Sequence, residues 1–230
     1  MRRTILAILV SIASTHSLRA HDFIWSQWET AALRQKGPDV ADGLLVYFHG
    51  AGPLAADRLP IVPFFVEVAR EANWDILRIN RLPFVDYDTA DADILAVVEA
   101  KVEEARRAGY RRVVLGGHSR GGWLALAGSS LANVDGVVGL APASPLLGGQ
   151  SADREAAILA ARMSQGRAPR IAAFFFEGDP RENTNERRAL MVRRVLETSS
   201  SSFLIVDHPP DLVGHSAAGY GLFTRRYRSC

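Results

Sequence analysis

Short apolar runs alternate with longer helix-like segments along most of this chain, and that order constrains the fold most strongly. Most of the runs are nearly continuous stretches of Val, Ile, Leu and Phe, which is typical of strands buried on both faces. They occupy residues 43–48, 74–79, 112–115, 134–140, 171–176 and 203–206. The helix-like segments occupy residues 60–72, 89–108, 121–131, 153–163, 183–197 and 216–227.

Helices between successive strands require parallel crossover connections. The pattern therefore predicts an open, doubly wound, mostly parallel α/β sheet of about six strands with helices on both faces. Residues 21–42 fit either an edge strand or a short helical turn. Because no repeat or linker divides residues 21–230, we expect them to form a single domain.

The N-terminus has the pattern of an export signal. Arg2 and Arg3 precede a short apolar stretch, and the small residue Ala20 stands where a signal peptidase would cleave. We expect residues 1–20 to be a signal peptide and the mature chain, residues 21–230, to be periplasmic or secreted. A first core helix or an uncleaved anchor is the alternative interpretation.

Charge and cysteine content exclude several functions. Residues 1–20 contain three arginines and no acidic residue, so their removal changes the net charge from +2 to −1. No clustered basic stripe remains for nucleic acid, and even the longest apolar run, near the N-terminus, is too short to span a bilayer as an ordinary transmembrane helix. Cys230 is the single cysteine, which excludes an intramolecular disulfide. We expect no nucleic-acid partner, no membrane span after signal removal, no metal and no other cofactor.

A G-x-S-x-G pattern, formed by Gly117, Ser119 and Gly121, lies between the third apolar run and the following helix-like segment. A serine on such a strand-to-helix turn is raised above the sheet edge, at the positive end of the helix. Glycines flank it because the backbones of strand and helix nearly touch. Ser119 is therefore the candidate nucleophile, whereas His118 is expected to pack or form hydrogen bonds.

The first apolar run ends in a turn with the sequence His-Gly-Ala-Gly, at residues 49–52. The negative oxygen that develops during ester cleavage needs preorganised backbone N–H donors. This turn can direct the Ala51 N–H toward the same point as the Arg120 N–H, so both are candidate oxyanion-hole donors. We expect His49 to brace the turn through its ring and the Arg120 side chain to form a surface ion pair.

A nucleophilic serine also needs a base and an acid that orients the base. Asp179 follows the fifth apolar run and His215 follows the last, so both should lie at the sheet edge of Ser119. His208 is less suitable as the base because two following prolines hold it close to the strand, whereas His215 follows Gly214. The carboxylates that stay open as alternatives to Asp179 are those of Glu177, Glu182 and Asp207.

With these motifs in this order, the sequence resembles the α/β-hydrolase superfamily from about Gly43 to Tyr227. Within it, the pattern is most similar to small, nearly lidless bacterial esterases and dienelactone-hydrolase-like enzymes. Compared with the usual sheet of the family, the N-terminal strands are missing or reduced. The resemblance implies a catalytic triad and an oxyanion hole at these positions: Ser119, His215 and Asp179, with the amides of Ala51 and Arg120.

The function predicted from these residues is that of a serine hydrolase. It would cleave a carboxylic ester through an acyl-enzyme intermediate, acting on a small ester or on an ester at the end of a polymer. Residues 142–169 have room only for a short helix or a small lid, which favours an open cleft. An amidase or peptidase with the same residues, and a catalytically silent binding protein, are the alternatives.

Overall fold

The structure is a computed structural model of the chain. It describes residues 23–27, 35–50, 64–81, 87–143, 152–179, 185–219 and 221–227. The expected signal peptide lies outside the described residues, as do two residues named above as site candidates, Ala51 and Glu182.

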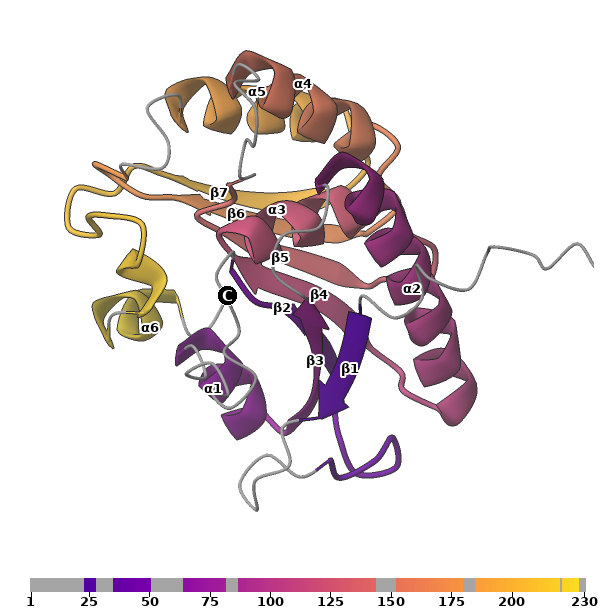
Figure 1. Cartoon of the computed structure of the whole chain (residues 1–230). Coiled ribbons are helices and arrows are strands. Elements are labelled where there is room, and N and C mark those ends of the chain that lie inside the picture. The colour runs from indigo at the N-terminus through magenta and orange to yellow at the C-terminus, as the bar shows by residue number, and fades with distance from the viewer. Residues whose placement is uncertain are drawn as a thin grey trace, which may run out of the picture.

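Within the described residues, seven strands form one sheet in the order β1-β3-β2-β4-β5-β6-β7 (Figure 1). Their bounds are β1 Phe23–Gln27, β2 Gly43–Phe48, β3 Trp74–Arg81, β4 Val113–His118, β5 Gly136–Leu140, β6 Arg170–Phe175 and β7 Ser202–Asp207. Strands β2 to β7 are parallel, which confirms the expected parallel sheet. β1 pairs antiparallel with β3, so the ambiguous segment after residue 20 contributes an edge strand.

Helices cover both faces of this sheet. Their bounds are α1 Phe64–Glu71, α2 Tyr87–Ala108, α3 Arg120–Ala127, α4 Ala152–Met163, α5 Asn185–Glu197 and α6 Gly221–Tyr227. Figure 1 shows α1 and α6 side by side on one face and the other helices on the opposite face. None of the helices in the described ranges is both long and apolar enough to cross a membrane.

Helix α2 buries the face that the spacing of its apolar residues predicts. Apolar residues three or four positions apart share one face of a helix, and here that face packs into the main core. The buried positions match the spacing in the sequence: Ile94, Val98, Val102 and Ala105. Gly109 follows the helix with φ of 109°, a conformation that glycine adopts without steric cost.

The segment between β5 and β6 contains α4, which packs against α3 and α5 on one face of the sheet. The sequence predicts either a short helix or a small lid in this segment, and α4 is a helix of the layer that covers the sheet. The last helix-like segment is shorter than expected, because a 3-10 turn at Ala217–Gly219 precedes α6.

The parallel register brings the C-terminal ends of β2, β4, β6 and β7 to the same edge of the sheet, where the candidate residues lie.

Candidate active site

Ser119 forms the turn between β4 and α3 with φ 57° and ψ −123°. This is an uncommon conformation for a residue other than glycine, and such strain typically costs about 1–3 kcal/mol. Three backbone hydrogen bonds hold it. The Ser119 N–H donates to the Leu140 carbonyl (2.8 Å), and the Ser119 carbonyl accepts from the N–H groups of Trp123 and Ala143 (both 3.0 Å). The surrounding backbone therefore imposes the conformation that the G-x-S-x-G pattern predicts.

The flanking glycines are required by close backbone packing. A Cβ at Gly121 would stand 2.0 Å from the carbonyl oxygen of Phe48, and one at Gly117 would stand 2.3 Å from the Gly121 carbonyl. Neither position can accept a methyl group unless the backbone moves, because protein interiors are close-packed and contain few voids of that size. The expected near-contact of strand and helix at this turn is confirmed.

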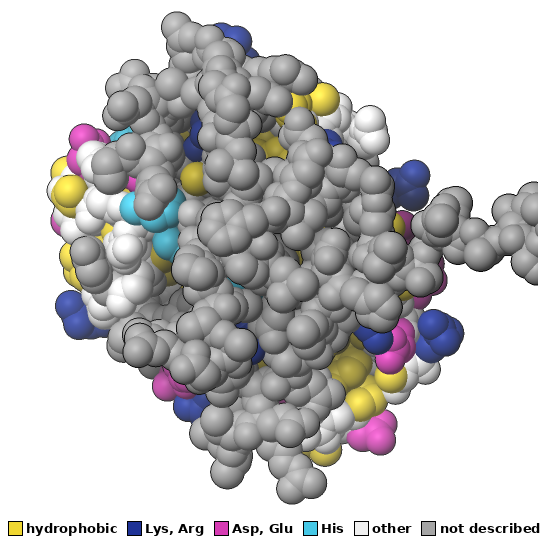
Figure 2. All heavy atoms as spheres, in the orientation of Figure 1, with side chains coloured by type: hydrophobic (Ala, Val, Ile, Leu, Met, Phe, Trp, Pro, Cys, Tyr) yellow, Lys and Arg dark blue, Asp and Glu magenta, His cyan; other side chains and the backbone are white. Residues whose placement is uncertain are grey.

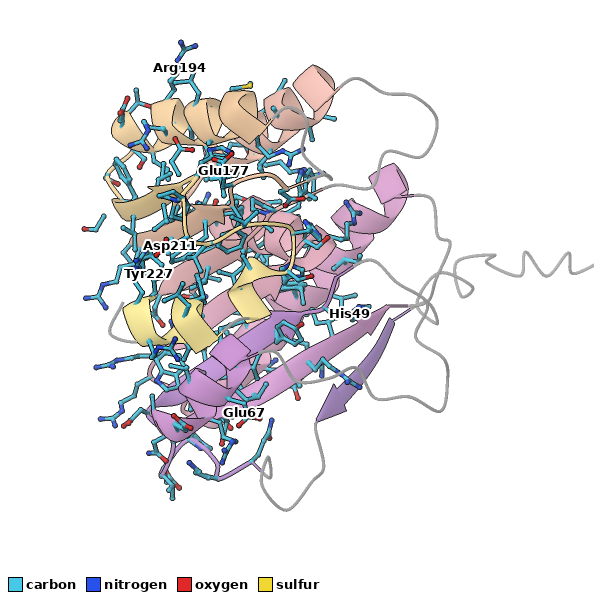
Figure 3. All side chains as sticks on the ribbon, turned by 90° about the vertical axis from the view of Figure 1, so that its left-hand side faces the viewer. His49, Glu67, Glu177, Arg194, Asp211 and Tyr227 are labelled. Atoms are coloured by element: carbon cyan, nitrogen blue, oxygen red, sulfur yellow. The ribbon has the colours of Figure 1, made fainter. Side chains whose placement is uncertain are left out.

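The turn that follows β2 lies beside Ser119. A Cβ at Gly50 would stand 3.5 Å from the Ser119 Cβ, so only ordinary van der Waals space separates the two segments. His49 is buried just beyond the end of β2 (Figure 3), and its Nδ1–H donates to the Gly50 carbonyl at 2.7 Å. The expected ring hydrogen bond of His49 is present, while Ala51 lies outside the described residues.

Arg120 is the first residue of α3, so its backbone N–H lies next to Ser119 at the helix N-terminus. The expectation that its side chain forms a surface ion pair was wrong: only 1% of Arg120 is exposed. Every residue of α3 is buried, because this helix lies under α4 and against β4 and β5. The guanidinium carbon of Arg120 stands 5.3 Å from the ring centroid of Trp123, within the range of a cation–π contact.

His215 and Asp179 form a hydrogen bond at the edge of the sheet. The distance between His215 Nδ1 and Asp179 Oδ2 is 2.7 Å. An ionised carboxylate only accepts hydrogen bonds, so Nδ1 carries the proton and the Nε2 of the neutral ring is left as the basic nitrogen. The Asp179 side chain is fully buried and that of His215 is 19% exposed. In Figure 2, which has the orientation of Figure 1, histidine side chains gather on the left-hand side of the molecule.

Backbone pairing beyond the ends of β6 and β7 brings this acid and this histidine together. Glu177 and Val213 form an isolated parallel bridge, and the Gly214 N–H donates to the Glu177 carbonyl at 2.8 Å. Asp179 and His215 each stand a short distance beyond this junction. Two residues 36 positions apart in the sequence thus become neighbours.

The alternative residues occupy different surroundings. The Glu177 side chain is exposed (Figure 3). Asp207 lies 2.5 Å from His208 (Oδ1 to Nδ1) and 3.6 Å from the guanidinium of Arg193, and its side chain is 38% exposed. The described part of the chain therefore holds two separate acid–histidine pairs, and the buried carboxylate belongs to the pair formed by Asp179 and His215.

His118 contacts His215 directly, which the sequence did not indicate. The Nε2–H of His118 donates to the backbone carbonyl of His215 at 2.7 Å, and the two ring centroids are 4.8 Å apart. Burial lowers the pKa of His118 below its usual value, so the neutral ring is favoured. The expectation of a hydrogen-bonding residue is confirmed, but its partner lies 97 residues away.

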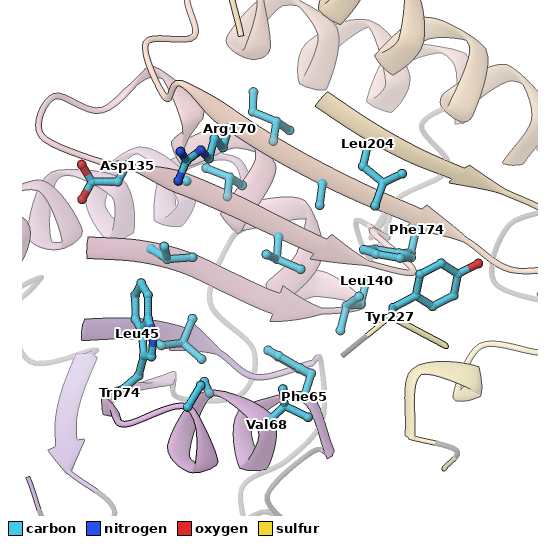
Figure 4. A pocket seen from close by; sticks show the side chains of 18 of the residues that line it. Leu45, Phe65, Val68, Trp74, Asp135, Leu140, Arg170, Phe174, Leu204 and Tyr227 are labelled. Atoms are coloured by element: carbon cyan, nitrogen blue, oxygen red, sulfur yellow. The ribbon is translucent and has the colours of Figure 1, made fainter. Parts of the chain in front are cut away.

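A groove of about 590 Å³ opens on the face that carries α1 and α6 (Figure 4). Side chains of the adjacent strands β2, β4, β5, β6 and β7, most of them apolar, form its floor, and Phe65 of α1 and Tyr227 of α6 form part of its walls. Ser119, Asp179 and His215 do not line it. The groove is therefore separate from the candidate active site. Among the described residues, no cluster of three or more His, Cys, Asp or Glu side chains is arranged to hold a metal ion.

Comparison with known proteins gives a family and a fold. The profile of the alpha/beta hydrolase family matches residues 44–200. Similar solved structures include an esterase of Pyrococcus furiosus, Pf2001 (TM-score 0.58, 13% identity, 84% of this chain and 80% of that one). A truncated carbohydrate esterase from gut microbiota has a TM-score of 0.58 at 13% identity over 93% of this chain and 90% of that one.

Est1E from Butyrivibrio proteoclasticus has a TM-score of 0.54 at 13% identity over 77% of this chain and 81% of its own. At such identities the likeness to solved structures establishes a shared fold. No curated protein matches this chain.

Proposed function

The chain belongs to the alpha/beta hydrolase family, and from this premise we propose that it is a serine-dependent carboxylic ester hydrolase. Ser119 is the nucleophile, His215 the base and Asp179 the acid that orients it. The observation that carries the proposal is the 2.7 Å hydrogen bond between His215 and the buried Asp179, in a loop that contacts the residue preceding Ser119. The similar solved structures named above are described as esterases, which supports an ester substrate.

The proposed reaction has two steps. In the first, His215 Nε2 takes the proton of the Ser119 hydroxyl as the serine oxygen bonds to the ester carbonyl carbon. The resulting tetrahedral intermediate expels the alcohol, which receives that proton from His215, and an acyl-enzyme remains. In the second step, water attacks the acyl carbon by the same proton transfers and releases the carboxylic acid. Asp179 stabilises the imidazolium form of His215 in both steps.

The oxyanion of each tetrahedral intermediate needs donors that are already in place. We assign this role to the backbone N–H groups of Arg120 and Ala51. The N–H of Arg120 stands at the positive end of α3, beside Ser119, and the close approach of Gly50 to Ser119 supports a donor from the following residue. One such donor is typically worth about 2.7–4 kcal/mol in the transition state.

We propose that the substrate is a small soluble ester or an ester at the end of a polymer. α4 packs in the helical layer against α3 and α5, which supports an open site. The test is labelling of purified protein with a fluorophosphonate, followed by hydrolysis assays with matched ester and amide series. We expect the label on Ser119 and faster turnover of short-chain esters. Labelling with faster amide turnover would identify an amidase, and no labelling of Ser119 would indicate a silent binding protein.

Asp179→Asn is expected to lower kcat by about 10⁴-fold. The amide can present an N–H to His215, which favours the ring tautomer that has its proton on the wrong nitrogen. Steady-state kinetics on one chromogenic ester measures the change. The same substitution in the second acid–histidine pair, Asp207→Asn, is the matched control, and Glu177→Gln tests the remaining described alternative. Both should stay near the wild-type rate. A loss in either control as large as that of Asp179→Asn would identify a different acid.

We also propose that the protein is exported and that residues 1–20 are its signal. The pattern of Arg2, Arg3, an apolar stretch and Ala20 supports this. Expression of the full chain in a Gram-negative host should give a periplasmic or secreted product that begins at His21 by N-terminal sequencing. A chain that lacks residues 2–20 should stay in the cytoplasm. Intact chain that is found only in the cytoplasm would refute the proposal.

A further inference from the structure

His118 connects the Ser119 turn to the loop that carries His215. Its Nε2–H binds the backbone carbonyl of His215 at 2.7 Å, and its ring lies against the His215 imidazole with centroids 4.8 Å apart and planes 52° apart. Because a carbonyl only accepts hydrogen bonds, the His118 proton must be on Nε2. One side chain thus contacts both the backbone and the ring of the proposed base, and it directly precedes the proposed nucleophile.

Two other hydrogen bonds within the described residues anchor the loop of His215. The Gly214 N–H is bound to the Glu177 carbonyl, and the His215 ring is bound to Asp179. Both anchors lead back to the β6 end of the sheet. The bond from His118 is different because it ties the loop to β4, the strand that ends at the Ser119 turn. It therefore links the two segments that must exchange a proton.

We propose that His118 is a positioning residue, which holds the backbone of His215 at a fixed distance from Ser119 through its Nε2–H. This inference rests on the proposed function of Ser119 and His215. A displacement of about 1 Å from reactive geometry can cost about 100-fold in rate, so one hydrogen bond can matter more for turnover than for folding.

The bond from His118 does not depend on the protonation state of its ring. Burial is the largest influence on the pKa of His118 and lowers it, while the hydrogen bond to the carbonyl of His215 and the charge of Asp179 act in the opposite direction. A neutral ring has a single N–H, and the carbonyl of His215 holds that proton on Nε2. The protonated ring also carries an N–H at Nε2 and can donate to the same carbonyl.

Two substitutions separate the hydrogen bond from the ring. His118→Phe keeps an aromatic ring against His215 but removes the donor, whereas His118→Gln places an amide N–H near the position of Nε2 and removes the ring. We expect His118→Phe to lower kcat by about 10- to 100-fold with a smaller change in KM, and His118→Gln to recover much of the loss. His208→Phe and His208→Gln, in the loop that follows β7, are the matched controls and should keep the wild-type kcat.

Turnover must be expressed per active site, titrated with a fluorophosphonate, so that unfolded protein does not count as lost catalysis. A purely structural role would lower the melting temperature and leave this kcat unchanged. The proposal is overturned if His118→Phe keeps the wild-type kcat. It is also overturned if His118→Gln and His118→Phe are both folded and equally slow, because the donor would then be irrelevant.

Proton NMR supplies a readout that does not depend on activity. The proton between His215 Nδ1 and Asp179 should give a downfield resonance in wild type and in His118→Gln, and the resonance should broaden or disappear in His118→Phe. An unchanged resonance in His118→Phe would contradict the positioning role. If Ser119→Ala instead keeps its turnover, the hydrolase proposal fails, and the NMR comparison still decides whether His118 positions His215.

Discussion

Ser119→Ala is expected to lower kcat for ester hydrolysis by about 10⁴- to 10⁶-fold and to leave the fold intact. The hydroxyl oxygen is the proposed nucleophile, so its removal eliminates the acyl-enzyme route. The interactions that define the turn use only the backbone N–H and carbonyl of Ser119. Alanine retains both groups and the same Cβ, so the strained conformation should persist.

Steady-state kinetics on a chromogenic ester, together with circular dichroism and thermal melting, measures both parts of this prediction. Ser164→Ala is the matched control, because the Ser164 hydroxyl is exposed just after α4 and donates to the Ala161 carbonyl. It should keep the wild-type rate and should not reduce fluorophosphonate labelling. A folded Ser119→Ala protein that retains a tenth of wild-type turnover would refute the assignment.

His215→Asn is expected to reduce kcat by about as much, roughly 10⁴- to 10⁶-fold, because serine and base act as a unit. The base must be neutral to accept the serine proton, so wild-type activity should fall when the pH is lowered far enough to protonate the base. The residual activity of His215→Asn should lack this acid limb. Burial lowers the pKa of His118 below its usual value, so any contribution of His118 to the limb is shifted to lower pH.

The pH–rate profiles of wild type, His215→Asn and His208→Asn, measured at saturating substrate, test this prediction. His208→Asn is the matched control because His208 has its own carboxylate partner, Asp207. We expect its profile to match that of wild type. An inactive His208→Asn enzyme, together with near-normal turnover and an unchanged acid limb in His215→Asn, would show that His208 is the base.

The strands and helices could be predicted because their causes are local. A strand buried on both faces must be apolar along its whole length, and a helix against the core must repeat apolar residues every three or four positions. β2 and α2 follow these rules, and the buried face of α2 is the one that the spacing of Val98 and Val102 indicates. The edge strand β1 could not be predicted uniquely, because the sequence of residues 21–42 fits either a strand or a short helical turn.

The Ser119 turn was also determined by the sequence alone. Its glycines are needed because backbone atoms of β2, β4 and α3 converge at this point, and any side chain at Gly117 or Gly121 would collide with a carbonyl. The five consecutive residues of the motif meet that requirement, so the turn can be predicted from the motif alone. The bracing of the neighbouring turn by His49 is equally local, since its partner is the next residue.

The pairing of acids with histidines was decided only by the tertiary structure. Asp179 follows β6 and Asp207 ends β7, while His208 and His215 both follow β7, so strand order leaves more than one combination open. The bridge between Glu177 and Val213 sets how the loops after β6 and β7 align, and that alignment pairs His215 with Asp179. A pattern within either loop contains no information about this register.

The contact of His118 with His215 and the burial of Arg120 have the same origin. His118 meets a carbonyl 97 residues away, and Arg120 is covered because α4 packs over α3. In both cases the surroundings of the side chain come from segments distant in the sequence, whose placement depends on packing across the whole sheet. Local sequence determined which residues stand at the sheet edge, whereas nonlocal packing determined which of them touch, because a side chain's partners depend on the relative positions of separate strands and helices.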